Sequence, residues 1–432
     1  MRPSLLTSLL IRLGRGLAAG LLLALLALAL GLLLSAAATG VGPGASLPPP
    51  LARTSAGPRW VPDSATVQVA AGPQYAAGWG WQLLWGRHHR RLWATPVTAR
   101  VLRLGPGTPG GLRPVQAGGS YQSRTLRLRA DDGREFVLRS VDKDARAALP
   151  AGWPRRLLGG LMRDQTSAGH PYAAYPAARL AEAAGVLHTN PQLVFVGDEA
   201  GLGQFRARYA NALYLLEERP DGDQRHAPSL GFAPRVISSS HLRARLGQQP
   251  APSPATARAF LRARLLDLWL GDWSRRPDQW RWAVFPTAQG NTRPEYRPIP
   301  RDRDQAFFQL GDGLYPGLIS LCVAKYQSLT PALTPRRVAG LRRSARALDL
   351  LLLRGLARAD FQAEADSLRR RLTDEALAQA LQAGPPEVRA QMSADLTPVL
   401  RARRAQLPAV AGWFFEQLQA DKEPVPEAVW RD

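Results

Sequence analysis

Two charged segments in the second half of the chain contain residue types that could perform chemistry. The segment "GDWSRRPDQWRW" (271–282) places carboxylates, arginines and tryptophans directly after an apolar helical stretch. The segment "YRPIPRDRDQAFF" (296–308) alternates arginine and aspartate after an apolar run. Burial of Phe307 and Phe308 would draw the carboxylates of Asp302 and Asp304 toward a cleft, where a metal ion or arginines must satisfy them. The alternative is an exposed strand, since mixed surface charge costs little.

The tryptophans of the first segment fit two interpretations. In the chemical interpretation, the charges face a cleft while Trp273, Trp280 and Trp282 wedge this loop against the neighbouring helices. In the structural alternative, the whole segment is a clamp of stacked tryptophan and arginine side chains, and its charges have no chemical role.

A second cationic feature lies in the first half of the chain. In the predicted strand "REFVLRSVDK" (134–143), alternation places Arg139 and Lys143 on one face. The loop with Gly118 and Gly119 precedes Arg139 by about twenty residues, so backbone amides and a cation would converge on one phosphate group. A glycine loop between strands is more often a simple hairpin.

The elements around these segments predict an α+β fold. Strands are expected near 113–143, 191–197 and 211–218, and a helix is expected over 255–270 with Ser253 as its N-cap and Pro254 in its first turn. Residues 331–415 have a helical pattern throughout. The adjacent His88 and His89 have poor spacing for two ligands of one metal, and a solvated basic turn is expected there.

The order of these features resembles the protein-kinase-like fold, and more closely its atypical members. These include secretory-pathway, spore-coat and HipA-type kinases, whose catalytic loops read like "GDxDRHxxN". The motifs are also similar to those of uncharacterised exported bacterial proteins that carry "GDWDRHEDQWRW" and "PIPRDRDQAF". The resemblance spans roughly 67–413 and implies a bilobal fold, with an antiparallel-sheet N-lobe and a mostly helical C-lobe.

The resemblance also implies roles for individual residues. Arg139 falls at the position of the lysine that contacts the nucleotide, with Lys143 as the alternative cation, and Glu217 lies in the stretch "LLEERP" that resembles the adenine hinge. Arginine in place of lysine exchanges a compact ammonium for a planar fork. The metal-binding amide falls at Gln279, the metal-binding aspartate at Asp302, and Asp304 is a second candidate.

The main departure from the family pattern is at the catalytic aspartate, whose position is occupied by Ser274. A serine cannot accept a proton near neutral pH, so the general-base contribution of about 10²–10⁴ in rate is expected to be absent. Phosphoryl transfer depends mostly on positioning and charge neutralisation. Slow phosphoryl transfer therefore remains a hypothesis. Arg275 follows the serine, and Asp272 and Asp278 are the nearby carboxylates.

The N-terminus predicts export. Three arginines precede an uncharged, leucine-rich run from Leu17 to Ala38, which is long enough to span a bilayer, and a Pro/Gly-rich stretch follows it. The expected divisions are a signal peptide or anchor (1–38), a linker (39–66), an N-lobe (67–220), a C-lobe (221–420) and a tail (421–432). The single cysteine, Cys322, excludes an intramolecular disulfide.

The formal net charge of +22 does not by itself indicate nucleic-acid binding. Only three of the 56 basic residues are lysines, and the arginines are scattered along the chain instead of forming one stripe.

Three hypotheses follow. The first is an exported kinase-like protein, either a weak phosphotransferase or a pseudokinase, that binds ATP or another nucleotide with Mg²⁺ or Mn²⁺. The second is a non-catalytic cell-envelope scaffold that binds a protein or glycan partner. The third is a cationic anchor to anionic polymer or lipid, in addition to membrane attachment through 17–38 if that run is not cleaved.

Overall fold

The computed structural model describes residues 65–430 except 109, 119–122, 249–250 and 287–293. The predicted signal or anchor segment, nearly all of the linker, and Gly119 lie outside the described residues. Within the described part, no helix combines the length and the apolar character that crossing a membrane requires.

The chain divides into two compact units. The smaller unit comprises 1–49, 120–122 and 143–166, and its described part contains the 3-10 helix η2 (Ala145–Ala148) and helix α4 (Trp153–Asp164). The larger unit contains every strand and all other described α-helices. The candidate site described below lies entirely within the larger unit.

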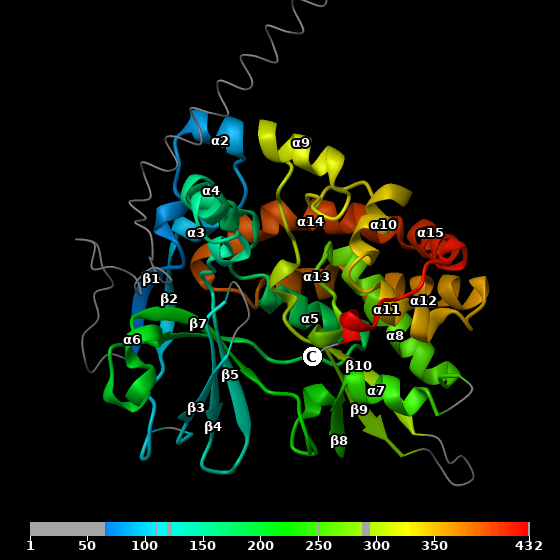
Figure 1. Ribbon diagram of the computed structural model, residues 1–432, viewed down its shortest axis with the longest axis horizontal. Coiled ribbons are helices and arrows are strands. Elements are labelled where there is room, and N and C mark those ends of the chain that lie inside the picture. The colour runs from blue at the N-terminus through cyan, green and yellow to red at the C-terminus, as the bar shows by residue number, and fades with distance from the viewer. Residues whose placement is uncertain (1–64, 109, 119–122, 249–250, 287–293, 431–432) are drawn as a thin grey trace, which may run out of the picture. The chain divides into compact units, whose positions relative to one another are not determined.

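A seven-stranded mixed sheet forms the first half of the larger unit (Figure 1). Its spatial order is β1-β2-β6-β7-β5-β4-β3. The strands are β1 (Thr66–Ala70), β2 (Pro96–Val101), β3 (Arg113–Gly118), β4 (Thr125–Arg129), β5 (Glu135–Ser140), β6 (Gln192–Val196) and β7 (Ala212–Glu218). The strands expected near 113–143, 191–197 and 211–218 are therefore confirmed.

The expectation of a purely antiparallel sheet is wrong at one pair. Strands β2 and β6 are parallel, with Arg100 opposite Val194, whereas the other neighbouring pairs are antiparallel. The chain between β2 and β6 forms the β3–β5 meander and then helix α5 (Ala174–Ala184). This long connection returns the chain in the same direction, which a short hairpin cannot do.

The central strands β6 and β7 are apolar on both sides because the sheet is covered on both faces. Leu193, Phe195 and Leu215 pack on one face with residues of helices α3 (Arg90–Ala94) and α5. Side chains of the alternate residues pack on the opposite face with Leu202 and Tyr209. Near-continuous apolar sequence is the expected pattern for such doubly buried strands.

A three-stranded antiparallel sheet and a set of helices form the second half of the larger unit. The strands are β8 (Arg235–Ser238), β9 (Trp280–Phe285) and β10 (Glu295–Pro300), in the order β10-β9-β8. The helices are α7 (Ser239–Leu246), α8 (Pro254–Leu270), α9 (Leu314–Cys322), α10 (Pro335–Arg342), α11 (Arg346–Leu353), α12 (Arg358–Arg371), α13 (Asp374–Leu381), α14 (Arg389–Ala405) and α15 (Leu407–Ala420). The helical pattern predicted for 331–415 is confirmed.

Helix α8 is the centre of this half. The Ser253 hydroxyl accepts a hydrogen bond from the Thr256 amide, and Pro254 occupies the first turn, as predicted. The helix is buried along most of its length by α11, α12, α14 and the β9–β10 hairpin. It ends at Gly271, whose positive φ of 70° is a common glycine C-cap and directs Asp272 into the following loop.

Candidate cleft at Arg139, Glu217 and Asp302

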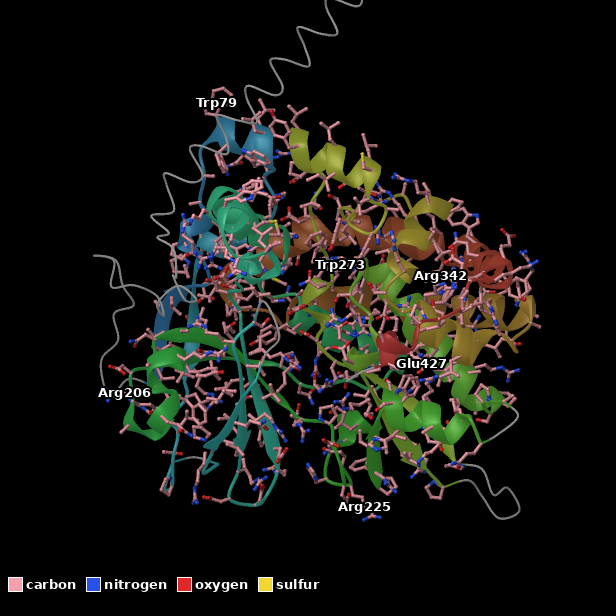
Figure 2. The ribbon with its side chains drawn as sticks, viewed as in Figure 1. Trp79, Arg206, Arg225, Trp273, Arg342 and Glu427 are labelled. Carbon is pink, nitrogen blue, oxygen red and sulfur yellow. The ribbon has the colours of Figure 1, made fainter. Side chains whose placement is uncertain are left out.

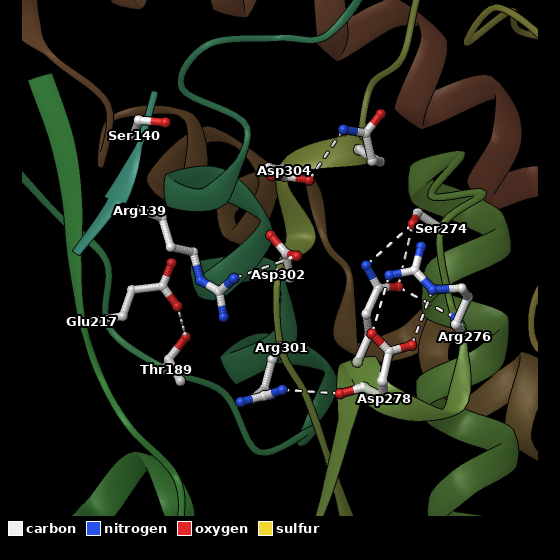
Figure 3. Close-up of polar contacts among 12 residues, drawn as sticks. Arg139, Ser140, Thr189, Glu217, Ser274, Arg276, Asp278, Arg301, Asp302 and Asp304 are labelled. Carbon is white, nitrogen blue, oxygen red and sulfur yellow. Dashed lines mark hydrogen bonds and ion pairs between the residues drawn. The ribbon is translucent and has the colours of Figure 1, made fainter. Parts of the chain in front are cut away.

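Arg139 lies on strand β5, one residue before the strand ends. It pairs with Leu215 of β7, while Val137 pairs with Glu217, so Arg139 and Glu217 are diagonal neighbours on one face of the sheet. The Arg139 guanidinium also approaches Asp302, with Nη1 3.5 Å from Oδ2 (Figure 3). Residues from three distant parts of the sequence therefore meet at one cation.

Glu217 is buried and points toward the same cation. Its Oε2 accepts a hydrogen bond of 2.7 Å from the Thr189 hydroxyl. Burial raises the pKa of the Glu217 carboxyl, and the positive charge of Arg139 opposes that shift. Thr189, Glu217, Asp302 and Arg303 are among the residues that line a small pocket here. The adenine-hinge role of Glu217 stays a prediction.

Of the other predicted nucleotide-binding residues, the structure describes Lys143 and Gly118. Strand β5 ends at Ser140, so the alternation that would place Lys143 on the face of Arg139 does not reach that residue. This part of the prediction is wrong, and Lys143 belongs to the smaller unit. Gly118 is the last residue of β3, paired with Thr125, and Gly119 falls outside the described residues.

Asp272 and Arg275 form a buried ion pair within the candidate catalytic loop. The side chains of both residues are 0% exposed, with Arg275 Nη2 3.1 Å from Asp272 Oδ2. The same guanidinium donates hydrogen bonds to the carbonyls of Arg301 and Asp302, at 2.9 and 2.6 Å. Arg275 therefore fastens this loop to the backbone of the Asp302 segment. Desolvation raises the pKa of Asp272 to about 6, against the opposing charge of Arg275.

Ser274 occupies the predicted catalytic position and is nearly buried, with 4% of its surface exposed. Its Oγ lies 3.1 Å from the Gln279 Nε2, and its backbone amide donates to Asp272 Oδ1 at 3.1 Å. Gln279 in turn accepts from the Arg276 amide through Oε1 at 3.3 Å. The serine and the predicted metal-binding amide therefore contact each other. Arg276 pairs with Asp278 at 3.0 Å in a more exposed position.

Each of the three predicted metal ligands has a protein partner in this structure. Asp302 pairs with Arg139, Gln279 contacts Ser274, and Asp304 accepts a hydrogen bond from Gln305 at 3.2 Å. Across the described ranges, no group of three or more His, Cys, Asp or Glu side chains lies close enough to hold a metal ion. Their oxygen donors suit Mg²⁺ chemically, and a metal site formed by these three residues stays a prediction.

Arg301 adds a second cation beside this cleft. Its Nη2 donates to the Asp278 carbonyl at 2.9 Å, whereas its Nε is buried and lacks a hydrogen-bond partner among the described residues. The Arg139 Nε is buried in the same way and also lacks such a partner within the described part. Burial and the charges of Arg281 and Arg139 lower the pKa of Arg301 to about 9. Two adjacent guanidiniums thus retain unused donors, which is a cost unless an anion satisfies them.

The tryptophans divide between two roles. Trp280 and Trp282 are fully buried on β9 and pack against Phe260 of α8, at ring-centroid distances of 5.0 and 5.5 Å. Trp273 instead contacts Phe308. The predicted wedge against the helices is therefore confirmed for Trp280 and Trp282, which hold β9 against α8, while the loop before them carries the charged residues.

A buried chain of ion pairs that the sequence interpretation missed holds the Asp302 segment in place. Arg303 pairs with Asp267 at 2.8 Å, Asp267 with Arg264 at 2.8 Å, and Arg264 with Asp349 at 2.9 Å. Asp267 and Arg264 are fully buried on α8. Charged residues within the otherwise apolar stretch "FLRARLLDLWL" were the available signal, because a charge on a buried helix needs a partner.

The predicted solvated turn at His88 and His89 is wrong. His89 is buried, and its Nε2 lies 2.8 Å from the carbonyl oxygen of Phe307. The Nδ1 of His88 lies 2.7 Å from a carboxylate oxygen of Asp312. Both histidines therefore contact the segment that follows Asp302, a tertiary arrangement that local charge patterning could not reveal.

No family model matches the chain, and no curated protein matches it significantly. Among solved structures, the chain is similar to a Helicobacter pylori protein described as the proinflammatory kinase CtkA. The two share 10% sequence identity with a TM-score of 0.35, over 71% of this chain and 96% of that chain. Similarity at this level carries no argument about this chain, so the proposal below depends on the chain's own residues.

Proposed function

We propose that the chain is an exported, kinase-like protein of the cell envelope whose Arg139–Asp302 cleft binds the phosphates of ATP or another nucleotide, together with Mg²⁺ or Mn²⁺. The observation that supports this proposal most directly is that the guanidiniums of Arg139 and Arg301 lie close enough for their charges to interact, beside the carboxylate of Asp302. Phosphate oxygens are strong acceptors for such donors.

The order of elements supports the same interpretation. A cation on β5, an acidic residue on β7, a loop after α8 and an aspartate after β10 occur in the sequence order expected for a kinase-like protein. Of these, Arg139, Glu217 and Asp302 converge in space. A metal bound by Asp302 would supply positive charge to neutralise the phosphates.

The loop geometry favours binding over rapid transfer. Ser274 lacks a basic group and contacts Gln279, while Asp272 is buried in an ion pair with Arg275. Neither side chain is placed to accept a proton from a substrate hydroxyl. The proposal is therefore a pseudokinase or a phosphotransferase of weak or altered activity, and a phosphate donor other than ATP would suit an exported protein.

A thermal-shift titration tests this proposal. Full-length protein in mild detergent would be titrated with ATP, other nucleotides and pyrophosphate, with and without Mg²⁺ or Mn²⁺. A ligand at 100 times its dissociation constant should stabilise the fold by about 2.7 kcal/mol. The Asp302→Asn variant should lose the metal-dependent part of that shift. Asp198→Asn is the matched control, because Asp198 pairs with Arg206 in an exposed surface ion pair.

A response that is equally large in Asp302→Asn would remove Asp302 from the site. A flat response to every ligand would reject nucleotide binding and favour the second candidate, a non-catalytic envelope scaffold that binds a protein or glycan.

Two contacts favour that scaffold specifically: Asp302 is already paired with Arg139, and Ser274 with Gln279. The scaffold predicts that Ser274→Asp combined with Arg276→His changes no binding property. Nucleotide binding that appears or strengthens in the double variant would count against it.

A further inference from the structure

Helices α2 (Trp79–Trp85) and α9 form an exposed apolar surface outside the cleft. Six of the ten exposed large hydrophobic side chains in the described part of the chain lie on these two short helices. They are Trp79, Leu83, Leu314, Leu318, Ile319 and Leu321. Trp79 is 83% exposed and Leu321 is 68% exposed, which is unusual for such side chains outside a binding surface. We call these six residues the α2–α9 patch.

The two helices are held together as one surface. Trp85 and Tyr315 pack with ring centroids 4.7 Å apart, and a Cβ on Gly313 would lie 2.2 Å from the Gly86 amide nitrogen. Figure 1 shows α2 and α9 next to each other, which agrees with their direct contact. The contact between His88 and Asp312 joins the segments immediately beside them. The patch is therefore one continuous surface, formed by two packed helices that are distant in the sequence.

The charges near the two helices in the sequence are mostly positive. Residues 73–95 contain three arginines and no acidic residue, and residues 309–345 contain five basic residues and one acidic residue, Asp312. Arg90 and Arg342 are buried and do not contribute to the surface, whereas Arg87, Arg91, Arg336 and Arg343 are exposed. Neither helix contains a charged residue. Arg87 follows α2 and is exposed, and Arg336 contacts the Leu321 carbonyl at the end of α9. Tryptophans and leucines with a basic rim are characteristic of surfaces that enter the headgroup region of an anionic membrane.

The chain before the patch provides a second argument for a membrane partner. The uncharged run of residues 17–38 ends 27 residues before β1, and the interval contains a Pro/Gly-rich stretch. If that run is a retained anchor, an extended stretch of this length reaches about 90 Å, so the face that carries α2 can lie against the bilayer surface.

We propose that the α2–α9 patch inserts into the interfacial region of an anionic phospholipid membrane and lays this face of the protein on the bilayer. The inference depends on the proposed export to the envelope but not on nucleotide binding. The patch would keep the protein oriented at the membrane whether or not residues 17–38 are retained.

Cys322 allows a direct test, because it is the only cysteine in the sequence and is exposed at the end of α9. The full-length chain would be labelled there with an environment-sensitive fluorophore and reconstituted with phosphatidylglycerol–phosphatidylethanolamine vesicles. Nitroxide groups on the lipid chains should quench the label, and its emission should shift to the blue. Replacing phosphatidylglycerol by phosphatidylcholine should weaken the quenching, because the basic rim loses its partner.

Control variants separate local insertion from general membrane attachment. Leu318→Glu with Leu321→Glu should reduce membrane contact of the Cys322 label about tenfold, while Val115→Glu on the β3 strand should not. A label moved to Arg225→Cys in a Cys322→Ser background should not be quenched. Figure 2 places Arg225 and Trp79 at opposite ends of the molecule. Circular dichroism would verify that each variant is folded.

Each result decides the proposal. Quenching at Cys322 that disappears in the double glutamate variant supports it. A label that stays water-like and unquenched on vesicles overturns it. A blue shift without quenching by lipid nitroxides would also overturn it and assign the patch to a protein partner or a second copy of the chain. None of these outcomes depends on the nucleotide titration, so the two proposals can fail separately.

Discussion

The guanidinium of Arg139 lies 3.5 Å from the carboxylate of Asp302 and thereby joins the seven-stranded sheet to the segment that follows β10. Glu217 adds a second carboxylate to the environment of the same cation, and Arg301 lies close enough for its charge to interact with that of Arg139. This cluster is the central feature of the candidate site. The stability of the fold and the proposed ligand chemistry both depend on how these charges are balanced.

A double-mutant cycle on Arg139→Met and Asp302→Asn should measure this coupling. Both side chains are partly buried, at 19% and 24% exposure, so each single change should destabilise the fold by roughly 1–2 kcal/mol with a coupling energy of about 0.5–2 kcal/mol. Urea unfolding of the four proteins provides the measurement. The same cycle on Arg206→Gln and Asp198→Asn, an exposed pair, should yield less than about 1 kcal/mol. Equal coupling in the two cycles would contradict a special role for the cleft pair.

Ser274→Asp should destabilise the fold in a pH-dependent way. The new carboxylate would be nearly buried beside the buried carboxylate of Asp272, which already accepts the Ser274 amide. We expect a loss of about 1–3 kcal/mol at pH 8 and a smaller loss at pH 5.5, because protonation relieves the repulsion between two carboxylates.

Ser274→Asn is the matched control for this change, since it has a similar shape and no charge. Denaturant unfolding of both variants at the two pH values is the measurement. Equal stability of the aspartate and asparagine variants at pH 8 would show that the site accepts a second charge. An aspartate at position 274 could then serve as a catalytic base.

Arg275→Met should be among the most destabilising changes in the loop. It leaves the carboxylate of Asp272 buried without its cation and removes two hydrogen bonds to the backbone of Arg301 and Asp302. Breaking a buried ion pair by removing one partner typically costs about 3–5 kcal/mol. The comparison is Arg276→Met, because Arg276 pairs with Asp278 at the surface and should cost less than about 1 kcal/mol. Similar losses in the two variants, measured by urea unfolding, would refute the structural role of Arg275.

The stability of the fold should fall as the pH decreases from about 6.5 to about 4. Burial lowers the pKa of His89 from 6.5 to about 4, while the Phe307 carbonyl opposes the shift, so the unfolded chain binds more protons across this window. The stabilisation by neutral His89 is therefore complete above pH 6.5 and is lost as the pH approaches 4. The expected slope is at most about 1.4 kcal/mol per pH unit for this group.

His89→Gln should reduce that slope, because glutamine can donate to the Phe307 carbonyl without titrating. His170 lies 4.8 Å from His89 between ring centroids, and its pKa is also lowered by burial, so part of the slope should persist. Unfolding midpoints in urea between pH 4 and 7 are the measurement. His241→Gln, at an exposed position of α7, should leave the slope unchanged. An unaltered slope in His89→Gln would mean that other groups control the acid sensitivity.

The sequence alone determined the features that depend on local patterns. Ser253 and Pro254 begin α8 because a hydroxyl cap and a proline suit the first turn, and Gly271 ends it because glycine tolerates a positive φ. The strands near 113–143, 191–197 and 211–218 followed from apolar runs bounded by turn residues. The charged segments at 271–282 and 296–308 could be selected as candidate sites because their residue types are costly to bury without partners.

Only the tertiary structure decided which charges meet. Ion pairs such as Arg139 with Asp302, Arg264 with Asp349, and Arg303 with Asp267 are formed by burial of facing elements, and local sequence does not encode which elements face each other. The predicted alternation does not reach Lys143 because β5 ends at Ser140, and His89 is buried because α3 packs beside the Phe307 segment. Burial selects one specific ion pair among several nearby charges, because an unpaired charge in the protein interior is strongly destabilising.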